Sequence, residues 1–393
     1  MPNPIKLLVI PSWYPPDGGY FFQEYSKAFA EKGFHVDELV NRITGITTLN
    51  KKTLKYLKRF NVSEYEGIRT IRSFYLKLPR LEKINVNRWI LSTGRLFDKY
   101  VSIYGKPDMI IAHCSIWAGC AAQHIFSKYN IPYIIVENRS LFIGLSEDSE
   151  KMFRKFYFPL LKKAFFSATK IVTVSSSLHT KIEAIEPSSS RKFLTISNLV
   201  DTGFFKLPEM SRDKEPFNVL SVARLAKVKG LDLLIRAFAR FLEKCPDASL
   251  RIAGRGPLLK ELIELTAELK IKDQVRFVGF LNKEGILREM HQANLLVLAS
   301  RDEAFGIVLI EAMSTGLPVI ATRSGGPVHI VNADAGILTD LENTDQLYAA
   351  LIKMYEQYER FDQEKIRSNT IERYSKETVM NQYTKLIDEI LSD

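Results

Sequence analysis

Short hydrophobic runs alternate along this chain with longer segments in which apolar residues recur at helical spacing. Most of the short runs are continuously apolar, which is typical of strands covered on both faces of a sheet. In the first half we predict strands at Ile5–Ile10, Phe34–Val40, Ile68–Phe74, Met109–Ala112, Tyr133–Val136, Lys170–Val174 and Phe193–Ile196. Predicted helices between them include Tyr20–Glu31, Trp117–Lys128 and Lys151–Phe166. Such alternation specifies an α/β fold with a doubly wound parallel sheet.

The alternation stops over residues 197–216, where two prolines and a charged cluster indicate an interdomain linker. It then restarts, with predicted strands at Phe217–Val222, Leu250–Ala253, Val275–Val278, Leu295–Ser300 and Val319–Ala321. Helices are predicted at Gly230–Glu243, Leu258–Leu269, near Lys283–His291, and from Gly306 to Gly316. We therefore predict two Rossmann-like domains, residues 1–205 and 206–370, that face each other across a cleft. Residues 371–393 continue a helical pattern, and we expect this last helix to pack back on the N-terminal domain.

Composition and length fit a soluble protein of two domains. The 393 residues exceed one ordinary core, and 46% hydrophobic and 25% charged residues are usual for globular chains. The apolar run IKLLVI reads as a first strand, because it is too short to span a bilayer and lacks a cleavage pattern. Cys114, Cys120 and Cys245 form no C-x-x-C pair and no cluster with histidine. We therefore expect a cytoplasmic protein with no metal site and no cofactor.

The net charge of +10 is concentrated in the first half of the chain. Residues 1–200 contain 29 Lys and Arg against 16 Asp and Glu, whereas the remainder contains 26 against 29. This asymmetry predicts an anionic partner for the first half. We expect no nucleic acid, because no recognition motif is present. A membrane surface or a phosphate-bearing acceptor is the better candidate.

The stretch NLLVLASRDEAFGIVLIEAMSTG, residues 294–316, predicts a buried strand, an acidic loop and a helix that begins near Gly306. The entrance of such a helix directs free backbone N–H groups at a ligand above the sheet, here those of Phe305, Gly306, Ile307 and Val308. Glu303 lies in the loop and Glu311 about a turn into the helix. The two carboxylates are therefore expected to contact two parts of one ligand, with the N–H groups suited to phosphate and the carboxylates to sugar hydroxyls.

Three other loops after strands carry candidate binding residues for an anionic ligand. Arg224 and Lys229 in VARLAKVKG could clamp a diphosphate, although loop cations are often merely solvated. Gly18 and Gly19 precede a helix, and Gly254 follows a strand in AGRGP, so a ligand could approach the backbone at either place. Both glycine loops are equally compatible with ordinary strand-to-helix turns. Neither contains the glycine fingerprint of a dinucleotide enzyme or a P-loop.

Polar residues also follow two predicted strands of the first domain. His113 ends one strand, where it is either a structural residue or a group that faces the cleft. Glu137, Asn138 and Arg139 occupy the corresponding place after the next strand. We assign these three only a weak role, on the side of the acceptor.

Several segments, in order from residue 11 to residue 327, closely resemble the large family 4 of retaining glycosyltransferases, which have the two-domain GT-B fold. They are SWYPP…GGYFFQEYSKAFAEKGFHV, VSSSL, SNLVD, SVARLAKVKG, AGRGPLLKEL, VRFVGF, EAFGIVLIEAMSTGLPVIAT and SGGP. Most are weak alone, but together with the two glutamates and the Arg–Lys pair they are specific. One departure is Glu137–Asn138, where related sequences often have Glu-His, and this weakens any acceptor-side role there.

The resemblance implies a role for each site residue. Arg224 and Lys229, with the backbone at Ile307 and Val308, would neutralise the diphosphate of a nucleotide-sugar donor without a metal ion. Glu311 would hold the ribose, and Glu303 the transferred sugar.

In the other domain, the resemblance implies that Gly19 would meet the phosphates and that His113 would lie near the donor sugar. The predicted reaction moves a hexose-type unit from a UDP- or GDP-sugar to a glycan or lipid-linked acceptor, with retention of configuration. Such acceptors belong to cell-surface polysaccharide or glycolipid synthesis.

Residues 51–60, KKTLKYLKRF, place five cations on one helical face. This fits a helix lying on an anionic membrane, but equally a solvated surface helix. A peripheral position on the inner face of the membrane is therefore an expectation. Two alternatives to the transferase stay open, a non-catalytic scaffold on the same fold and a nucleotide-sugar epimerase.

Overall fold

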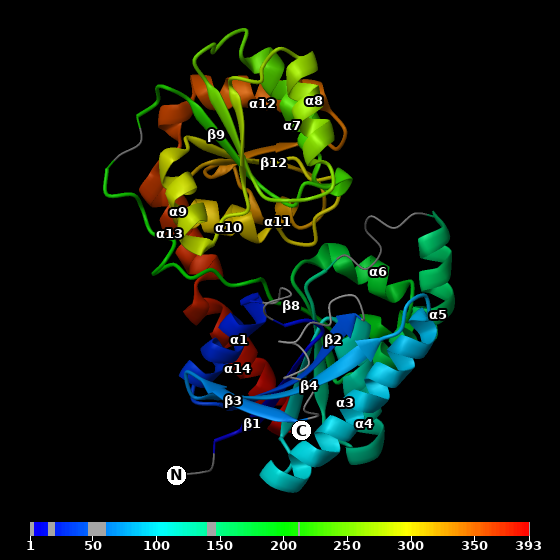
Figure 1. The fold of residues 1–393 in the computed structure, drawn as a ribbon. Coiled ribbons are helices and arrows are strands. Elements are labelled where there is room, and N and C mark those ends of the chain that lie inside the picture. The colour runs from blue at the N-terminus through cyan, green and yellow to red at the C-terminus, as the bar shows by residue number, and fades with distance from the viewer. Residues whose placement is uncertain (1–3, 15–19, 46–59, 140–146, 211–212, 393) are drawn as a thin grey trace.

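The computed structural model describes residues 4–14, 20–45, 60–139, 147–210 and 213–392. Among these residues the chain forms two sheets, one in each lobe of the molecule (Figure 1). The predicted basic helix at residues 51–60 falls almost entirely outside the described residues, as do Gly18 and Gly19. None of the described helices is long and apolar enough to cross a membrane.

The first sheet has the order β3-β4-β2-β1-β5-β6-β7-β8 among the described residues. Its strands are β1 Lys6–Pro11, β2 His35–Gly45, β3 Asn61–Tyr65, β4 Ile68–Lys77, β5 Met109–His113, β6 Tyr133–Glu137, β7 Lys170–Thr173 and β8 Phe193–Thr195. All neighbours pair in parallel except β3, which is antiparallel to β4. The parallel sheet that the sequence predicts is present, but the hairpin of β3 and β4 was not predicted.

Helices cover both faces of the first sheet. They are α1 Tyr20–Glu31, α3 Glu82–Tyr104, α4 Cys120–Tyr129, α5 Glu147–Ser167 and α6 His179–Glu183. Because side chains alternate along a strand, Leu7 and Val9 of β1 pack with α1 on one face, whereas Leu8 and Ile10 join the core under α3 and α4 on the other. This double coverage explains the continuous apolar run of β1.

One predicted helix begins later than the sequence indicates. The prediction began at Trp117, but α4 begins at Cys120, after a turn over Ser115–Gly119. In this turn Trp117 has a φ of 72°, and Cys114, directly before the turn, has a φ of 70°. Positive φ values are costly for bulky residues, so the surrounding packing has to hold this turn in place.

The second sheet has the order β11-β10-β9-β12-β13-β14, and all its pairs are parallel. Its strands are β9 Asn218–Val222, β10 Ser249–Ala253, β11 Val275–Gly279, β12 Leu295–Leu298, β13 Val319–Thr322 and β14 Gly336–Thr339. Its helices are α7 Leu231–Phe241, α8 Leu259–Glu268, α9 Lys283–Gln292, α10 Ile307–Ser314, α11 Pro327–Ile330 and α12 Thr344–Glu356. In β12, Leu295 and Val297 face the core with α7 and α12, while Leu296 and Leu298 face α10.

The C-terminal helices connect the two lobes. Helix α13, Gln363–Tyr374, lies in the upper lobe of Figure 1 and packs on α10. Helix α14, Lys376–Ser392, lies beside α1 in the lower lobe, and its Val379, Met380 and Tyr383 join the core of the first sheet. The predicted domain boundaries at residues 205 and 370 stay predictions.

Candidate active site

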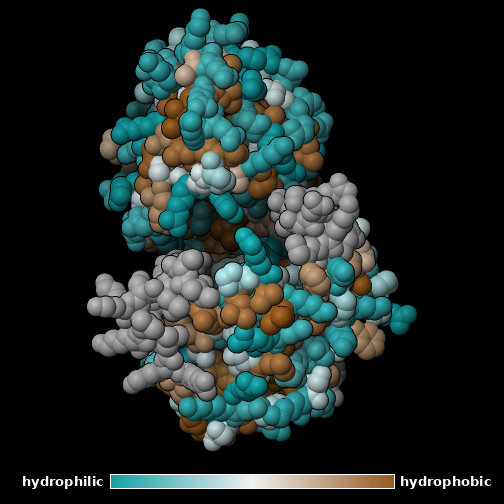
Figure 2. All heavy atoms as spheres, turned by 45° about the vertical axis from the view of Figure 1, so that its right-hand side comes forward, coloured by the Kyte–Doolittle hydropathy of each residue, from teal (hydrophilic) through white to brown (hydrophobic). Residues whose placement is uncertain are grey.

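Both sheets reverse their strand order at one point, and the predicted site residues follow the strands at these points. In the second sheet the order reverses between β9 and β12, and in the first between β1 and β5. Open parallel sheets bind ligands at the carboxyl ends of the strands beside such a reversal. Arg224 follows β9 and Glu303 follows β12, whereas His113 ends β5. Figure 2 shows the surface hollowed between the two lobes.

The helix α10 begins directly after Gly306, as the sequence predicts. Gly306 has a φ of 104°, a left-handed conformation that residues with a side chain rarely adopt. The N–H groups of Ile307 and Val308 begin the helix and have no intrahelical partner. Both residues are partly exposed, while Phe305 is buried against Tyr374. The helix entrance therefore offers backbone donors to a ligand at the carboxyl edge of the sheet.

Lys229 and Glu303 meet in an ion pair across this edge. The Lys229 Nζ atom lies 2.5 Å from Oε2 of Glu303, and Ser300 Oγ donates to the same oxygen over 3.2 Å. Both charged side chains are mostly but not fully buried, at 23% and 16% exposure. The structure thus brings together a cation and a carboxylate that are 74 residues apart in sequence. Each holds the other in position at the mouth of the α10 entrance.

The loop of Glu303 is also joined to the segment after β13. The N–H of Glu303 donates to the Ser324 carbonyl over 2.9 Å, and the N–H of Gly326 donates to the Glu303 carbonyl over 2.8 Å. A Cβ atom on Gly326 would lie 2.3 Å from the Cα of Phe305, so only glycine permits this approach. The SGGP motif, to which the sequence analysis assigned no role, thus supports the loop of Glu303.

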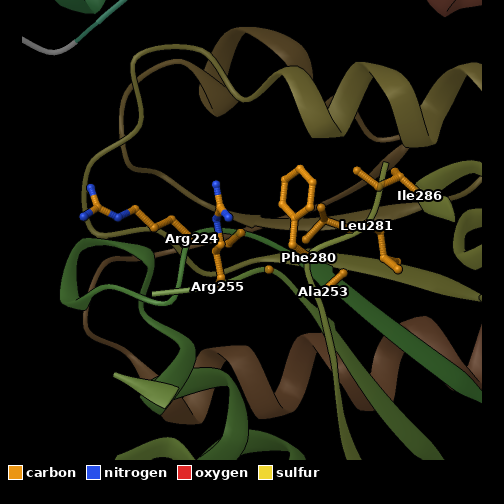
Figure 3. A pocket seen from close by; sticks show the side chains of 9 residues that line it. Arg224, Ala253, Arg255, Phe280, Leu281 and Ile286 are labelled. Atoms are coloured by element: carbon orange, nitrogen blue, oxygen red, sulfur yellow. The ribbon is translucent and has the colours of Figure 1, made fainter. Parts of the chain in front are cut away.

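Arg224 borders a cavity of about 580 Å³ at the carboxyl ends of β9, β10 and β11. Arg255 and Phe280 stand side by side in it (Figure 3), with the guanidinium of Arg255 4.9 Å from the centre of the Phe280 ring. The other residues that line the cavity are Val222, Ala223, Ala253, Gly254, Leu281 and Ile286. An apolar floor with a flat ring and two cations suits a planar, anionic ligand.

Gly254 permits this cavity to form. Its φ is 144°, and a Cβ atom there would lie 1.9 Å from the carbonyl oxygen of Ala223. The sequence analysis proposed that a ligand approaches the backbone at Gly254. In the structure, the backbone of Gly254, after β10, also lies close to that of Ala223, after β9. The sequence analysis did not single out Arg255 or Phe280, because neither residue type signals a binding site by itself.

Glu311 lies on the first turns of α10 and is partly exposed. Burial raises the pKa of this carboxyl to about 7, while Lys283 acts in the opposite direction. No hydrogen bond to its side chain is present among the residues that the structure describes. A carboxylate with unused acceptor capacity at this position can bind ligand hydroxyl groups.

His113 is completely buried at the end of β5. Its ring stacks on Phe22 with a centroid distance of 4.7 Å and lies 5.5 Å from the ring of Tyr25. Neither ring nitrogen has a hydrogen-bond partner among the residues that the structure describes, and burial lowers the pKa of His113 to about 3. The imidazole is therefore neutral.

Glu137 is also fully buried, and its carboxylate is engaged by the neighbouring backbone. Oε2 accepts from the N–H of Ser115 over 2.8 Å and from the Ser115 hydroxyl, and Oε1 accepts from the N–H of Arg139 over 3.1 Å. Its contacts are those of a residue that fixes loop positions. Asn138 and Arg139, which follow it, are only partly buried.

Contacts between the lobes involve the loop that carries Glu303. Ser175 Oγ donates to the Ala304 carbonyl over 2.6 Å, and Ser176 Oγ lies 3.0 Å from Nε2 of His329. Lys181 Nζ lies 2.8 Å from Oδ2 of Asp302. The VSSSL segment of the first lobe thus meets the second lobe directly beside Glu303.

Two family models match the chain in succession. The model described as "Glycosyltransferase Family 4" matches residues 19–204, and the one described as "Glycosyl transferases group 1" matches residues 206–373. An uncharacterized glycosyltransferase of Methanocaldococcus jannaschii is 26% identical over 73% of this chain and 76% of its own length. Some other relatives match over less than two thirds of their own length.

Solved structures share the fold over the whole chain. The sucrose-phosphate synthase of Thermosynechococcus elongatus superimposes with a TM-score of 0.78 and 20% identity, over 98% of this chain and 99% of that one. The Anabaena protein HepE in complex with UDP gives a TM-score of 0.72 and 18% identity, over 98% and 100%. The predicted GT-B fold is confirmed, and the chain belongs to the glycosyltransferases of the group 1 and family 4 type.

Proposed function

We propose that this glycosyltransferase moves a hexose-type sugar from a UDP- or GDP-sugar to a glycan or lipid-linked saccharide, with retention of configuration and without a metal ion. The observation that carries the proposal is the Lys229–Glu303 pair at the entrance of α10, with Arg224 nearby after the neighbouring strand β9. Acceptors of this kind belong to the synthesis of cell-surface polysaccharide or glycolipid.

The donor would lie along the second sheet. Its base fits the cavity beside Arg255 and Phe280, where a planar ring can stack. Its ribose hydroxyls would donate to Glu311, which has unused acceptor capacity. Its diphosphate would meet Arg224, Lys229 and the N–H groups of Ile307 and Val308, because cations and a helix entrance both favour negative charge.

In the reaction, the bond between the anomeric carbon and the diphosphate oxygen breaks while the acceptor oxygen bonds to that carbon. Negative charge develops on the leaving diphosphate, and the two cations and the helix entrance would stabilise it. The leaving phosphate takes the proton of the acceptor hydroxyl on the same face, so no side chain is required as a general base. Glu303 would hold the sugar during the transfer.

A thermal-shift screen with UDP-, GDP-, ADP- and TDP-sugars tests the donor assignment. We expect a UDP- or GDP-sugar to raise the unfolding temperature, because a ligand that binds only the folded state stabilises it. The shift should be lost in Arg224→Ala and retained in Arg276→Ala, an exposed arginine of β11 outside the cavity. Absence of a shift with every nucleotide sugar, and with UDP and GDP, would contradict the assignment.

We place the enzyme on the cytoplasmic face of a membrane, where a lipid-linked acceptor would be met. The support is the excess of 13 positive charges in residues 1–200. Flotation with vesicles is the test: the protein should float with anionic vesicles at low salt and not with neutral ones. Equal flotation with both would exclude an electrostatic association.

A further inference from the structure

Two loops of the first sheet meet above the strand that ends at His113. In the sheet order, β5 lies between β1 and β6. Trp13 follows β1 and Arg139 follows β6, and the guanidinium of Arg139 lies 4.6 Å from the centre of the Trp13 ring. The Trp13 ring also lies beside Phe22, with a centroid distance of 5.7 Å, and the Phe22 ring stacks on His113. Arg139 is thus held at the carboxyl edge of the first sheet, the edge where an open parallel sheet binds its ligands.

Arg139 forms no ion pair with the residues that the structure describes. Its Nε atom is buried and has no hydrogen-bond partner among these residues. The adjacent carboxylate, that of Glu137, is occupied by the backbone N–H groups of Ser115 and Arg139 and by the Ser115 hydroxyl. An aromatic face orients a guanidinium while leaving its N–H groups free to bind a planar anion.

Asn138 adds two further unsatisfied atoms beside this cation. Both its Nδ2 and its Oδ1 atoms are buried, and neither has a hydrogen-bond partner in the described ranges of the chain. A buried amide without hydrogen-bond partners destabilises the folded protein, because it gives up its bonds to water on folding. Native proteins rarely keep such a cost without a function, and a bound ligand would remove it.

A second arginine lies over the ring of Tyr14, the residue after Trp13. The guanidinium of Arg72, from β4, lies 5.1 Å from the centre of the Tyr14 ring, and its buried Nε atom likewise has no hydrogen-bond partner among the described residues. Two cations therefore approach the Trp13–Tyr14 segment from strands on opposite sides of β1. Both favour negative charge at this edge of the sheet.

We propose that Asn138 and Arg139 bind an anionic group, a phosphate or a carboxylate, carried by the acceptor. This inference rests on the proposed function, because it assigns the first lobe to the acceptor. Arg139 would bind the anion through its N–H fork, and Asn138 would donate through Nδ2. Trp13 is a positioning residue that keeps the guanidinium in place.

Calorimetric titration of the intact protein, saturated with UDP or GDP, tests the proposal. Saturation keeps the probe anions away from Arg224 and Lys229. We expect inorganic phosphate or malonate to bind the wild type saturably and glycerol not to bind. Arg139→Gln should weaken the binding about ten- to a hundred-fold, the usual effect of losing a charge-assisted contact. Comparing phosphate with malonate distinguishes a phosphate site from a carboxylate site.

Arg88→Gln is the matched control, since Arg88 is exposed and also stacks on an aromatic ring, that of Tyr75. It should bind the anion like the wild type. Binding of neither anion to the nucleotide-saturated wild type would overturn the proposal, as would equal binding by Arg139→Gln. Failure of UDP and GDP to bind at all would instead contradict the proposed function, so the two failures are distinguishable.

Discussion

The polar groups at the carboxyl edges of the two sheets differ in how they are paired. After β9 and β12, Lys229 pairs with Glu303, and Arg224 borders a cavity at the same edge of the sheet. After β5 and β6, His113 and Arg139 stack on aromatic rings, and atoms of His113 and Asn138 have no hydrogen-bond partner within the described part of the chain. The second sheet therefore already holds paired charges at this edge, whereas the first sheet leaves hydrogen-bonding capacity unused among the residues that the structure describes.

Of the changes that test this comparison, we expect the removal of Lys229 to have the largest effect. Lys229→Ala should lower turnover of the donor about 10²- to 10³-fold, because the charge that develops on the diphosphate loses a fixed cation. Binding of UDP or GDP should weaken as well. Both quantities can be measured by release of nucleoside diphosphate and by calorimetry.

Lys227→Ala is the matched control, since Lys227 is exposed and lies two residues earlier in the same short turn. It should behave like the wild type. Unchanged turnover and nucleotide affinity in Lys229→Ala would show that the ion pair with Glu303 is only structural.

Replacing Glu311 tests whether a residue of the proposed binding site lowers the stability of the folded protein. Its pKa of about 7, raised from an ordinary value near 4.5, means that the folded state binds more protons between these values. Wild-type stability should therefore fall as pH rises from 4.5 to 7. Glu311→Gln should be more stable at pH 8 by on the order of 3 kcal/mol at most, and by much less at pH 5.

The same variant should bind nucleoside diphosphate about tenfold more weakly, because an amide loses charge-assisted hydrogen bonds to the ribose. Unfolding curves at the two pH values and calorimetry measure both effects. The exposed Glu372→Gln should change neither. A gain in stability without a loss of affinity would remove Glu311 from the binding site.

For His113, in the first sheet, we expect a smaller dependence of stability on pH, with the opposite sign. Its pKa of about 3 lies below the ordinary 6.5, so the unfolded state binds more protons between these values. Wild-type stability should therefore decrease as pH falls below 6.5, by about 2 kcal/mol at pH 5. His113→Gln should lack this part of the acid sensitivity, as thermal unfolding at pH 7 and pH 5 would measure.

His124→Gln serves as the control, since His124 is only partly buried on α4 and should leave the acid sensitivity as it is. Equal sensitivity of His113→Gln and the wild type would indicate that the imidazole becomes charged without unfolding the protein.

Periodicity predicted the two sheets because their strands are buried on both faces and read as apolar runs. It missed β3, four of whose five residues are exposed, so that no apolar pattern marks the strand. It also began α4 too early, because nothing in the residue type of Trp117 announces a φ of 72°. Local pattern reports burial and propensity, and it fails where tertiary packing sets the backbone.

The same distinction between local pattern and tertiary packing applies to the residues of the site. Glu303, Lys229 and Gly306 could be proposed from the sequence because each lies in a motif with its own loop chemistry. The stacking of Arg139 on Trp13 could not, because the two residues lie 126 positions apart and meet only through the order of three strands. Gly18 and Gly19 lie outside the described residues, so their predicted phosphate contacts stay predictions.

The position of α14 bears on how the chain folds during synthesis. Val379, Met380, Tyr383 and Ile387 cover the face of the first sheet that contains Leu7 and Val9. When residues 1–205 leave the ribosome, α1 is the one helix among their described residues that covers this face. The second sheet has all its strands by residue 339, well before α14 is made. The half of the protein that is translated first therefore completes its core last.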